Sequence, residues 1–181
     1  MFKIFHIIKK KNIHDYKLKI ESPNLDLACN SFHFVILSSW LLNQQIEKVD
    51  ISKLKKWQNA KRKGFYDVIG TIKFFFKGNS YVRYTSDIKK KKSGLKLKIN
   101  KQNYIINNKY TTIKHNRSVI KSNDLSVSNV MNLEVKNILK NKNTKLPKFE
   151  TIYNNHLIYI NSLLLHFNKN RKSKTKILPI T

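Results

Sequence analysis

The chain has 181 residues and carries 37 lysines and arginines against 10 acidic residues, a formal charge of +27. Hydrophobic residues make up 40% of it and aromatic residues 11%, which excludes an intrinsically disordered tail. Because a free globular protein gains nothing from self-repulsion on that scale, the charge predicts a polyanionic partner, either nucleic acid or an anionic membrane surface.

No membrane-spanning or targeting segment is expected. The most apolar stretch, Phe32–Leu42, is far shorter than the roughly 20 apolar residues of a spanning helix, so we interpret it as a core helix. The apolar start of the chain ends in lysines and no small-residue cleavage site follows it. The abundance of Lys, Asn and Ile and the scarcity of Gly and Ala are typical of an AT-rich genome. Together these features predict a protein encoded inside an organelle, the mitochondrion.

Catalytic chemistry has little support in the sequence. The single cysteine, Cys29, has no second cysteine for a disulfide or a metal site, and we interpret it as a buried structural thiol. The six histidines show no metal-ligand spacing, and neither a Gly-rich phosphate loop nor a nucleophile elbow is present. The sequence therefore predicts a protein that is not an enzyme and holds no cofactor or metal.

The first third of the chain predicts a strand and a helix. Residues 15–22 alternate apolar and charged side chains, as in a half-buried strand. Apolar residues then fall at helical spacing over 25–46, with Asn24 as the N-cap after Pro23.

A second helix is predicted over residues 50–65. Asp50 or Ser52 would cap it, Leu54, Trp57 and Ala60 would face the core, and Gly64 would end it. For Trp57, core packing is favoured over stacking on a nucleic-acid base.

The middle of the chain changes to strand periodicity. Residues 68–76 and 81–88 predict two strands joined by a short turn, and residues 94–99 predict a third strand with lysines on one face. The run Lys89–Lys92 could be a solvated, disordered charge run or a basic loop that holds an anion. Its position between two strands favours the loop.

The order of these elements resembles the universal small-subunit ribosomal protein number eight (S-eight). The resemblance covers roughly residues 25–139. It is carried by Ser52–Lys55 (SKLK), Gly64–Phe65 (GF), Lys73–Phe75, Lys92–Lys96 (KSGLK) and Val119–Ile120. The family's RNA-contacting loop would correspond to Lys114–Ser118, where its hydroxyl residues are not kept.

This resemblance implies an α+β fold of two small α/β subdomains, with helices on short, mostly antiparallel sheets and basic extensions at both ends. The expected segments are an N-terminal extension (1–24), an N-terminal subdomain (25–88), an RNA-binding subdomain (89–140) and a C-terminal extension (141–181). Residues 141–149 would be a linker, 151–167 a strand or docked helix, and the final basic tail would extend along RNA or a neighbouring protein.

The implied function is a structural, non-catalytic component of the small subunit of a mitochondrial ribosome in the matrix. It would bind the central domain of small-subunit ribosomal RNA and contact neighbouring ribosomal proteins. The predicted RNA-binding residues are Lys53, Lys55, Lys89, Lys90, Lys91, Lys92, Ser93, Gly94, Lys96, Lys114, His115, Asn116, Arg117 and Ser118. Val119 and Ile120 would lie in the core. The alternative is a basic accessory subunit of an organellar membrane complex.

Overall fold

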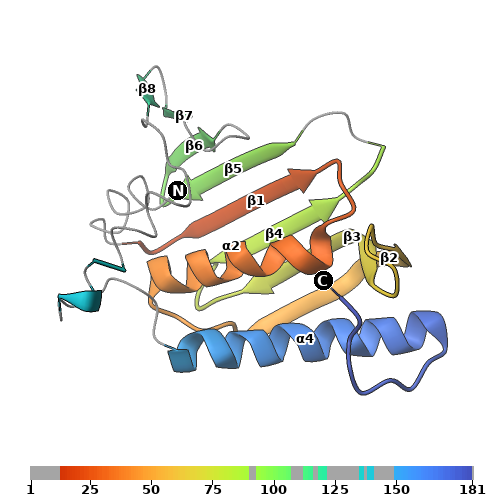
Figure 1. Cartoon of the computed structure of the whole chain (residues 1–181). Helices are drawn as coiled ribbons and strands as arrows, with labels where there is room; N and C mark the ends of the chain where they lie inside the picture. Colours follow the sequence, from red (N-terminus) through yellow and green to blue (C-terminus); the bar gives the residue numbers. More distant parts are fainter. Residues whose placement is uncertain are drawn as a thin grey trace.

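The computed structural model describes residues 13–89, 93–106, 112–115, 118–121, 135–136, 138–140 and 149–180 (Figure 1). In chain order the elements are β1 (Tyr16–Ser22), α2 (Leu27–Leu42), β2 (Lys48–Asn59), β3 (Tyr66–Phe75), β4 (Tyr81–Ser86), β5 (Gly94–Ile99), β6 (Gln102–Ile106), β7 (Thr112–His115), β8 (Ser118–Lys121) and α4 (Phe149–Arg171). Among the described residues, neither helix is long and apolar enough to cross a membrane.

The strands form one eight-stranded sheet in the order β2-β3-β4-β1-β5-β6-β7-β8. Only β1 and β4 pair in parallel, and every other neighbouring pair is antiparallel. The α+β class and the mostly antiparallel pairing are therefore confirmed. The sheet contains strands from three of the four predicted segments, and the division of the chain into those segments stays a prediction.

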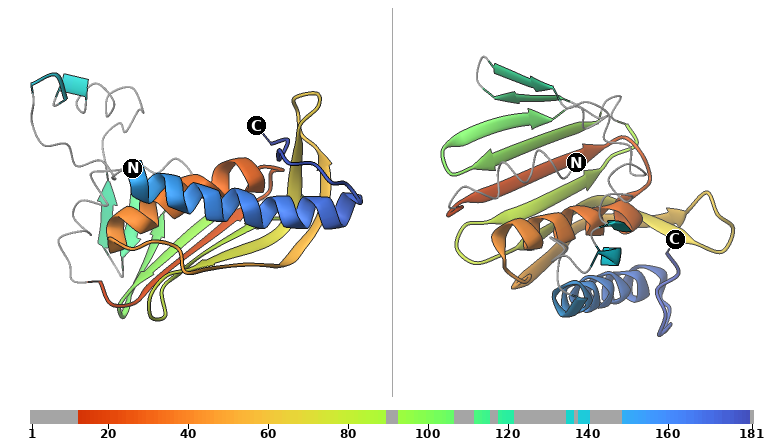
Figure 2. Two further views of the ribbon diagram at one scale, coloured as in Figure 1. Left: turned by 90° about the horizontal axis from the view of Figure 1, so that it is seen from below. Right: turned by 60° about the vertical axis from the view of Figure 1, so that its left-hand side comes forward.

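Alternation of side chains gives the sheet two different faces. In β1, Tyr16, Leu18 and Ile20 are buried, while Lys17 and Lys19 point to the other side. Helices α2 and α4 both lie on the face that holds the apolar residues, with α2 over β3 and β4 and α4 against β2 and α2 (Figure 2). The predicted strands at 15–22, 68–76, 81–88 and 94–99 and the helix at 25–46 are confirmed within a few residues at their ends.

The predicted helix over residues 50–65 is wrong, because this segment is strand β2 and the turn that follows it. Its pairing with β3 shifts register twice, between Asp50 and Lys53 and again between Leu54 and Trp57. Each bulge adds residues to one strand, so Leu54 and Trp57 are both buried although they lie three positions apart. That spacing imitates a helix face. The prediction that Trp57 belongs to the core is confirmed.

Helix α2 begins at Leu27, and the predicted N-cap Asn24 is wrong. Asp67 on β3 takes the capping role instead: its Oδ1 accepts hydrogen bonds from the backbone N–H groups of Ala28 (2.8 Å) and Val68 (2.7 Å). Burial raises the pKa of the Asp67 carboxyl above its usual value, and these backbone hydrogen bonds oppose the rise.

Helix α4 joins the core through polar as well as apolar residues. Tyr159 donates to the carbonyl of Ala28 (2.6 Å). Asn155, with no exposed surface, accepts from the backbone N–H of Ile46 (2.9 Å) and donates to Ser39 Oγ (2.9 Å). The expectation of a strand or docked helix at 151–167 thus resolves as a docked helix. The predicted linker 141–149 lies outside the described residues except for Phe149, which begins α4.

The described part of the basic tail folds back against its own chain, so the prediction that it is extended is wrong. Asn168 near the end of α4 organises a turn by bonding to Ser173 and to both the N–H and carbonyl of Thr175. The chain then returns to the sheet, where Leu178 is buried and the carbonyl of Pro179 accepts from the N–H of Tyr66 (2.8 Å).

Candidate functional site

A pocket of 360 Å³ lies where β1 ends, between the start of α2 and the start of β5. Because β1 and β4 run parallel, both carboxyl ends point to this edge, the position where open α/β sheets commonly bind ligands. Its polar lining includes Glu21, Ser22, Asn24, Asp26, Asn30 and His33.

The Asp26 carboxylate organises the pocket. Its Oδ1 accepts from Tyr84 Oη (3.0 Å), and its Oδ2 accepts from Ser22 Oγ (2.9 Å) and Asn30 Nδ2 (3.2 Å). Ser22 Oγ in turn accepts from the N–H of Asn24 (3.1 Å). These contacts tie two strands and a helix together, so the polar groups are held in place before any ligand arrives. The N-terminus of α2 also favours a negative charge there.

The other pocket groups differ in accessibility. His33 is exposed on α2 and can exchange hydrogen bonds with a ligand, while Glu21 is half-buried on β1. Phe34 and Tyr84 supply an aromatic wall, with ring centroids 5.8 Å apart. The site combines carboxylate, amide and hydroxyl groups with aromatic rings, which suits a small molecule with both hydroxyl groups and an apolar face.

The pocket does not fit a dinucleotide cofactor. Such a cofactor places its pyrophosphate on free N–H groups at a helix N-terminus, reached through a glycine-rich turn. Here the turn from β1 to α2 has no glycine, Asp26 adds a negative charge, and Asp67 already binds the N–H of Ala28. Among the described residues, no three His, Cys, Asp or Glu side chains are grouped so as to hold a metal ion.

Two of the predicted RNA-binding residues line the pocket, namely Ser93 and Gly94. Lys89 is exposed in the turn after β4, with its N–H bonded to Asp87. Lys90, Lys91 and Lys92 lie outside the described residues.

The remaining predicted residues are spread over four strands. Lys53 and Lys55 are exposed on β2, far along the sheet from Lys96 on β5. Lys114 is exposed on β7, and Asn116 and Arg117 lie outside the described residues.

His115 is half-buried and stacks on Tyr104, with ring centroids 4.5 Å apart. Ser118 bonds to the carbonyl of His115 (2.7 Å). Val119 is 51% exposed, so its predicted place in the core is wrong, and no side-chain position is described for Ile120.

Sequence analysis missed the pocket itself. The signal was available in the segment Ser22–Asp26, where a cluster of polar residues directly follows a strand and opens a helix. Within that segment the sequence pattern predicted only Asn24 as a helix cap, Ser22 as the end of a strand, and no role for Asp26.

The sequence matches no protein-family model, and it matches no curated protein significantly. Several solved structures share its fold. A dehydrogenase from Clostridium difficile has a TM-score of 0.56 at 13% identity over 91% of this chain and 58% of its own. The UDP-N-acetylglucosamine 3-dehydrogenase from Acidithiobacillus ferrooxidans has a TM-score of 0.59 at 9% identity, over 90% of this chain and 55% of its own. A dehydrogenase from Chromobacterium violaceum has a TM-score of 0.55 at 8% identity, over 94% and 59%.

The chain therefore spans less than two thirds of each of these enzymes, and the likeness establishes the fold alone. It contradicts the resemblance to S-eight, because the shared fold is one found in dehydrogenases. Ser52–Lys55 lies in a bulged strand where that resemblance required a helix. In a lysine-rich chain, short basic motifs such as SKLK recur without a common fold.

The predictions that rested on S-eight are corrected by the same finding. The assignments as a ribosomal component and an rRNA-binding scaffold are wrong, and so are the ribosomal partners. The expectation of a non-enzyme is contradicted because the similar solved structures named above are dehydrogenases. The alternative of a membrane-complex subunit is also unsupported. Location in the mitochondrion stays a prediction from base composition.

Proposed function

We propose that the protein binds a small, hydroxyl-rich molecule of the sugar class in the pocket between β1, α2 and β5. The observation that carries the proposal is the fixed Asp26 network at the carboxyl ends of the parallel strands. A site whose polar groups are already oriented binds without the cost of ordering them.

The chemistry of the lining supports a sugar. Asn30 and His33 can bond to ligand hydroxyls from α2, and the rings of Phe34 and Tyr84 can cover an apolar sugar face. The volume of 360 Å³ lies at the small end of the range for ligand pockets. One structural neighbour is named for its action on UDP-N-acetylglucosamine, so this compound and N-acetylglucosamine are the first ligands to test.

The proposal concerns binding by this domain, with the exposed His33 as a group that can form hydrogen bonds with the ligand. The residues present do not fit a dinucleotide, so no hydride-transfer step is assigned to this chain.

The test is calorimetric titration of the full chain with N-acetylglucosamine and its UDP derivative. Asn30→Leu fills the pocket with an apolar side chain, and Asn154→Leu makes the same change at an exposed position of α4. We expect the pocket variant to weaken binding by about tenfold or more, equivalent to about 1.4 kcal/mol, and the control to bind normally. Equal binding by both variants, or no heat with either ligand, contradicts the proposal.

A further inference from the structure

The face of the sheet opposite the helices, here called the open face, carries a row of cations that crosses the strands. The strand register places each residue of the row directly opposite the next one on the neighbouring strand. From β2 to β8 the row consists of Asp50, Lys73, Arg83, Lys19, Lys96, Ile105, Lys114 and Val119. Neighbouring strands lie about 4.8 Å apart, so the five cations span roughly 24 Å.

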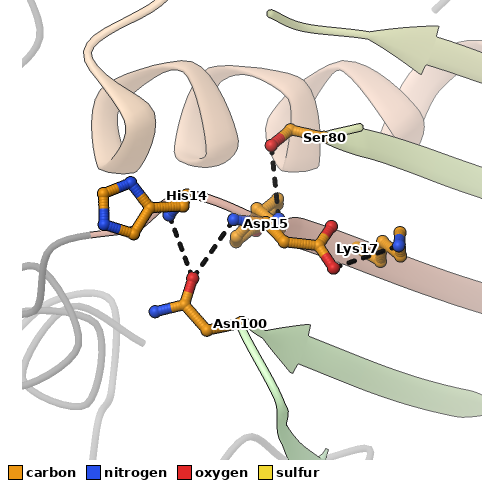
Figure 3. A network of polar contacts seen from close by, with 6 residues as sticks. His14, Asp15, Lys17, Ser80 and Asn100 are labelled. Atoms are coloured by element: carbon orange, nitrogen blue, oxygen red, sulfur yellow. Dashed lines mark hydrogen bonds and ion pairs between the residues drawn. The ribbon is translucent and has the colours of Figure 1, made fainter. Parts of the chain in front are cut away.

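Among the described residues, Asp50 at the end of the row, opposite Lys73, is the one acidic member of the row, and the other cations have no acidic cross-strand neighbour in it. The single ion pair between two described residues joins Lys17 and Asp15 (3.0 Å), beside the row, where Asn100 holds the start of β1 (Figure 3). In the row itself, Lys73 Nζ lies 4.4 and 4.1 Å from the ring centroids of Phe75 and Tyr81. Among the described residues, Arg83 Nε is buried and has no hydrogen-bond partner. An unsatisfied guanidinium nitrogen among like charges is costly unless an anion binds there.

A second copy of the chain cannot cover this face, because each copy carries a formal +27 and would set cations against cations. The occupant must be anionic. The spacing of the row restricts the class of anionic occupant further. Glutamates three or four positions apart on a helix repeat every 4.5–6 Å, which is about the distance between neighbouring strands.

The apolar residues in the row also favour a helical occupant. Ile105 is 55% exposed between Lys96 and Lys114, and Val119 is 51% exposed at the end of the row. A helix with mixed acidic and apolar residues can contact both kinds of side chain. Duplex nucleic acid carries a charge every ~3.4 Å of axis on each strand, which is denser than the row, and its phosphate backbone offers Ile105 and Val119 no apolar partner.

We propose that the open face binds an acidic, amphipathic α-helix of a partner protein, laid across the strands along the row from Lys73 to Lys114. This surface is independent of the pocket and lies on the other side of the sheet from α2. At 1.5 Å per residue, a helix of about 16 residues covers the row.

The experiment uses the full chain and a fluorescent helical peptide with glutamates at every third or fourth position and alanines and leucines between them. Anisotropy at low salt should show binding that weakens as salt rises. The double variant Lys19→Thr, Lys96→Thr should weaken binding by about tenfold or more. The matched control Lys61→Thr, Lys63→Thr removes the same charge from the exposed turn after β2 and should have a much smaller effect.

Two further probes decide the class of partner. A peptide of the same composition interrupted by two prolines cannot form the helix, and we expect it to bind clearly more weakly. Equal binding by the proline peptide overturns the helical partner, and equal losses in both double variants overturn the row as the site. If an RNA or DNA oligonucleotide of equal charge displaces the peptide more effectively than unlabelled peptide does, the acidic-helix proposal is wrong and the face binds nucleic acid.

Discussion

The two faces of the sheet differ in how their polar groups are satisfied. On the helix-covered face, Asn155 and Tyr159 bond to backbone and side chains, and the N-terminus of α2 is closed by Asp67. On the open face, the described residues form no ion pair with the row from Lys73 to Lys114, and Asp50, opposite Lys73, is the one acidic residue in the row. Most polar groups of the covered face thus have partners within the chain, whereas most cations of the row on the open face have no acidic partner among the described residues.

The largest effect is expected where β2 bulges against β3. Gly70 has φ +133°, and a Cβ there would lie 2.4 Å from the carbonyl oxygen of Lys53 and 2.8 Å from Cα of Leu54. Both neighbours are backbone atoms that cannot yield without moving the strand. We expect Gly70→Ala to reduce the free energy of unfolding by about 4 kcal/mol, measured by denaturant titration.

Gly94→Ala is the matched control for this change. A Cβ at Gly94 meets nothing within 4 Å, so a loss below about 0.5 kcal/mol is expected. Similar losses in the two variants would show that β2 does not press on β3 as the structure describes.

The same bulges explain why β2 could not be predicted. Strands with strict alternation, such as β1 and β5, were recognised because Leu18 and Leu95 repeat with period two among lysines. In β2 the buried residues Leu54 and Trp57 are three apart, and only the partner strand shows why. Local sequence favours a helix there, and tertiary pairing overrides it.

The segment Ser22–Asp26 gives a sequence signal for one side of the candidate site, but the assembly of the whole site could not be predicted, for a similar reason. Its organising contacts join Asp26 to Tyr84, fifty-eight positions away, and depend on the parallel pairing of β1 with β4. Parallel pairing across a helix leaves no local pattern. The cation row likewise arises from register, and its members Lys96 and Lys114 were predicted to bind RNA through the resemblance to S-eight and not through this register.

A smaller loss is expected from the polar core of the covered face. Asn155→Ala leaves the N–H of Ile46 and the hydroxyl of Ser39 without this partner, and should cost about 2–3 kcal/mol. Asn154→Ala, one position away and exposed, should change the free energy of unfolding by less than about 0.5 kcal/mol. If both variants unfold at the same denaturant concentration, the hydrogen bonds of α4 do not hold it to the core.

Stability should also depend on pH through His166, where α4 meets β2. Its Nδ1 accepts from Trp57 Nε1 (3.0 Å), and burial, aided by the charge of Lys169, lowers the pKa of the imidazole below its usual value. As the pH falls, the unfolded chain therefore binds a proton at His166 at a higher pH than the folded chain does. The contribution of neutral His166 to the free energy of unfolding is complete above pH about 6.5 and is lost as the pH falls through the lowered pKa.

His166→Gln keeps an acceptor for Trp57 and removes the titration. We expect the difference in free energy of unfolding between wild type and variant to shift against wild type as the solution is acidified from neutral pH. Parallel curves would mean that protonation of His166 leaves the contact with Trp57 intact.

The smallest effect tests the open face directly. Lys19 and Lys96 lie opposite each other on β1 and β5, and like charges in that position are destabilising by a few tenths of a kcal/mol. Lys96→Thr should therefore raise the free energy of unfolding by about 0.5 kcal/mol at low salt, and the gain should fade in about 1 M salt as the repulsion is screened.

Lys55→Thr, on exposed β2 away from the row, makes the same change in β-propensity and charge without relieving that contact. A gain that survives high salt, or one equal in both variants, would mean that the row is not under electrostatic strain. The open face would then contain lysines that the fold tolerates without cost, and the contrast between the two faces would be one of composition alone.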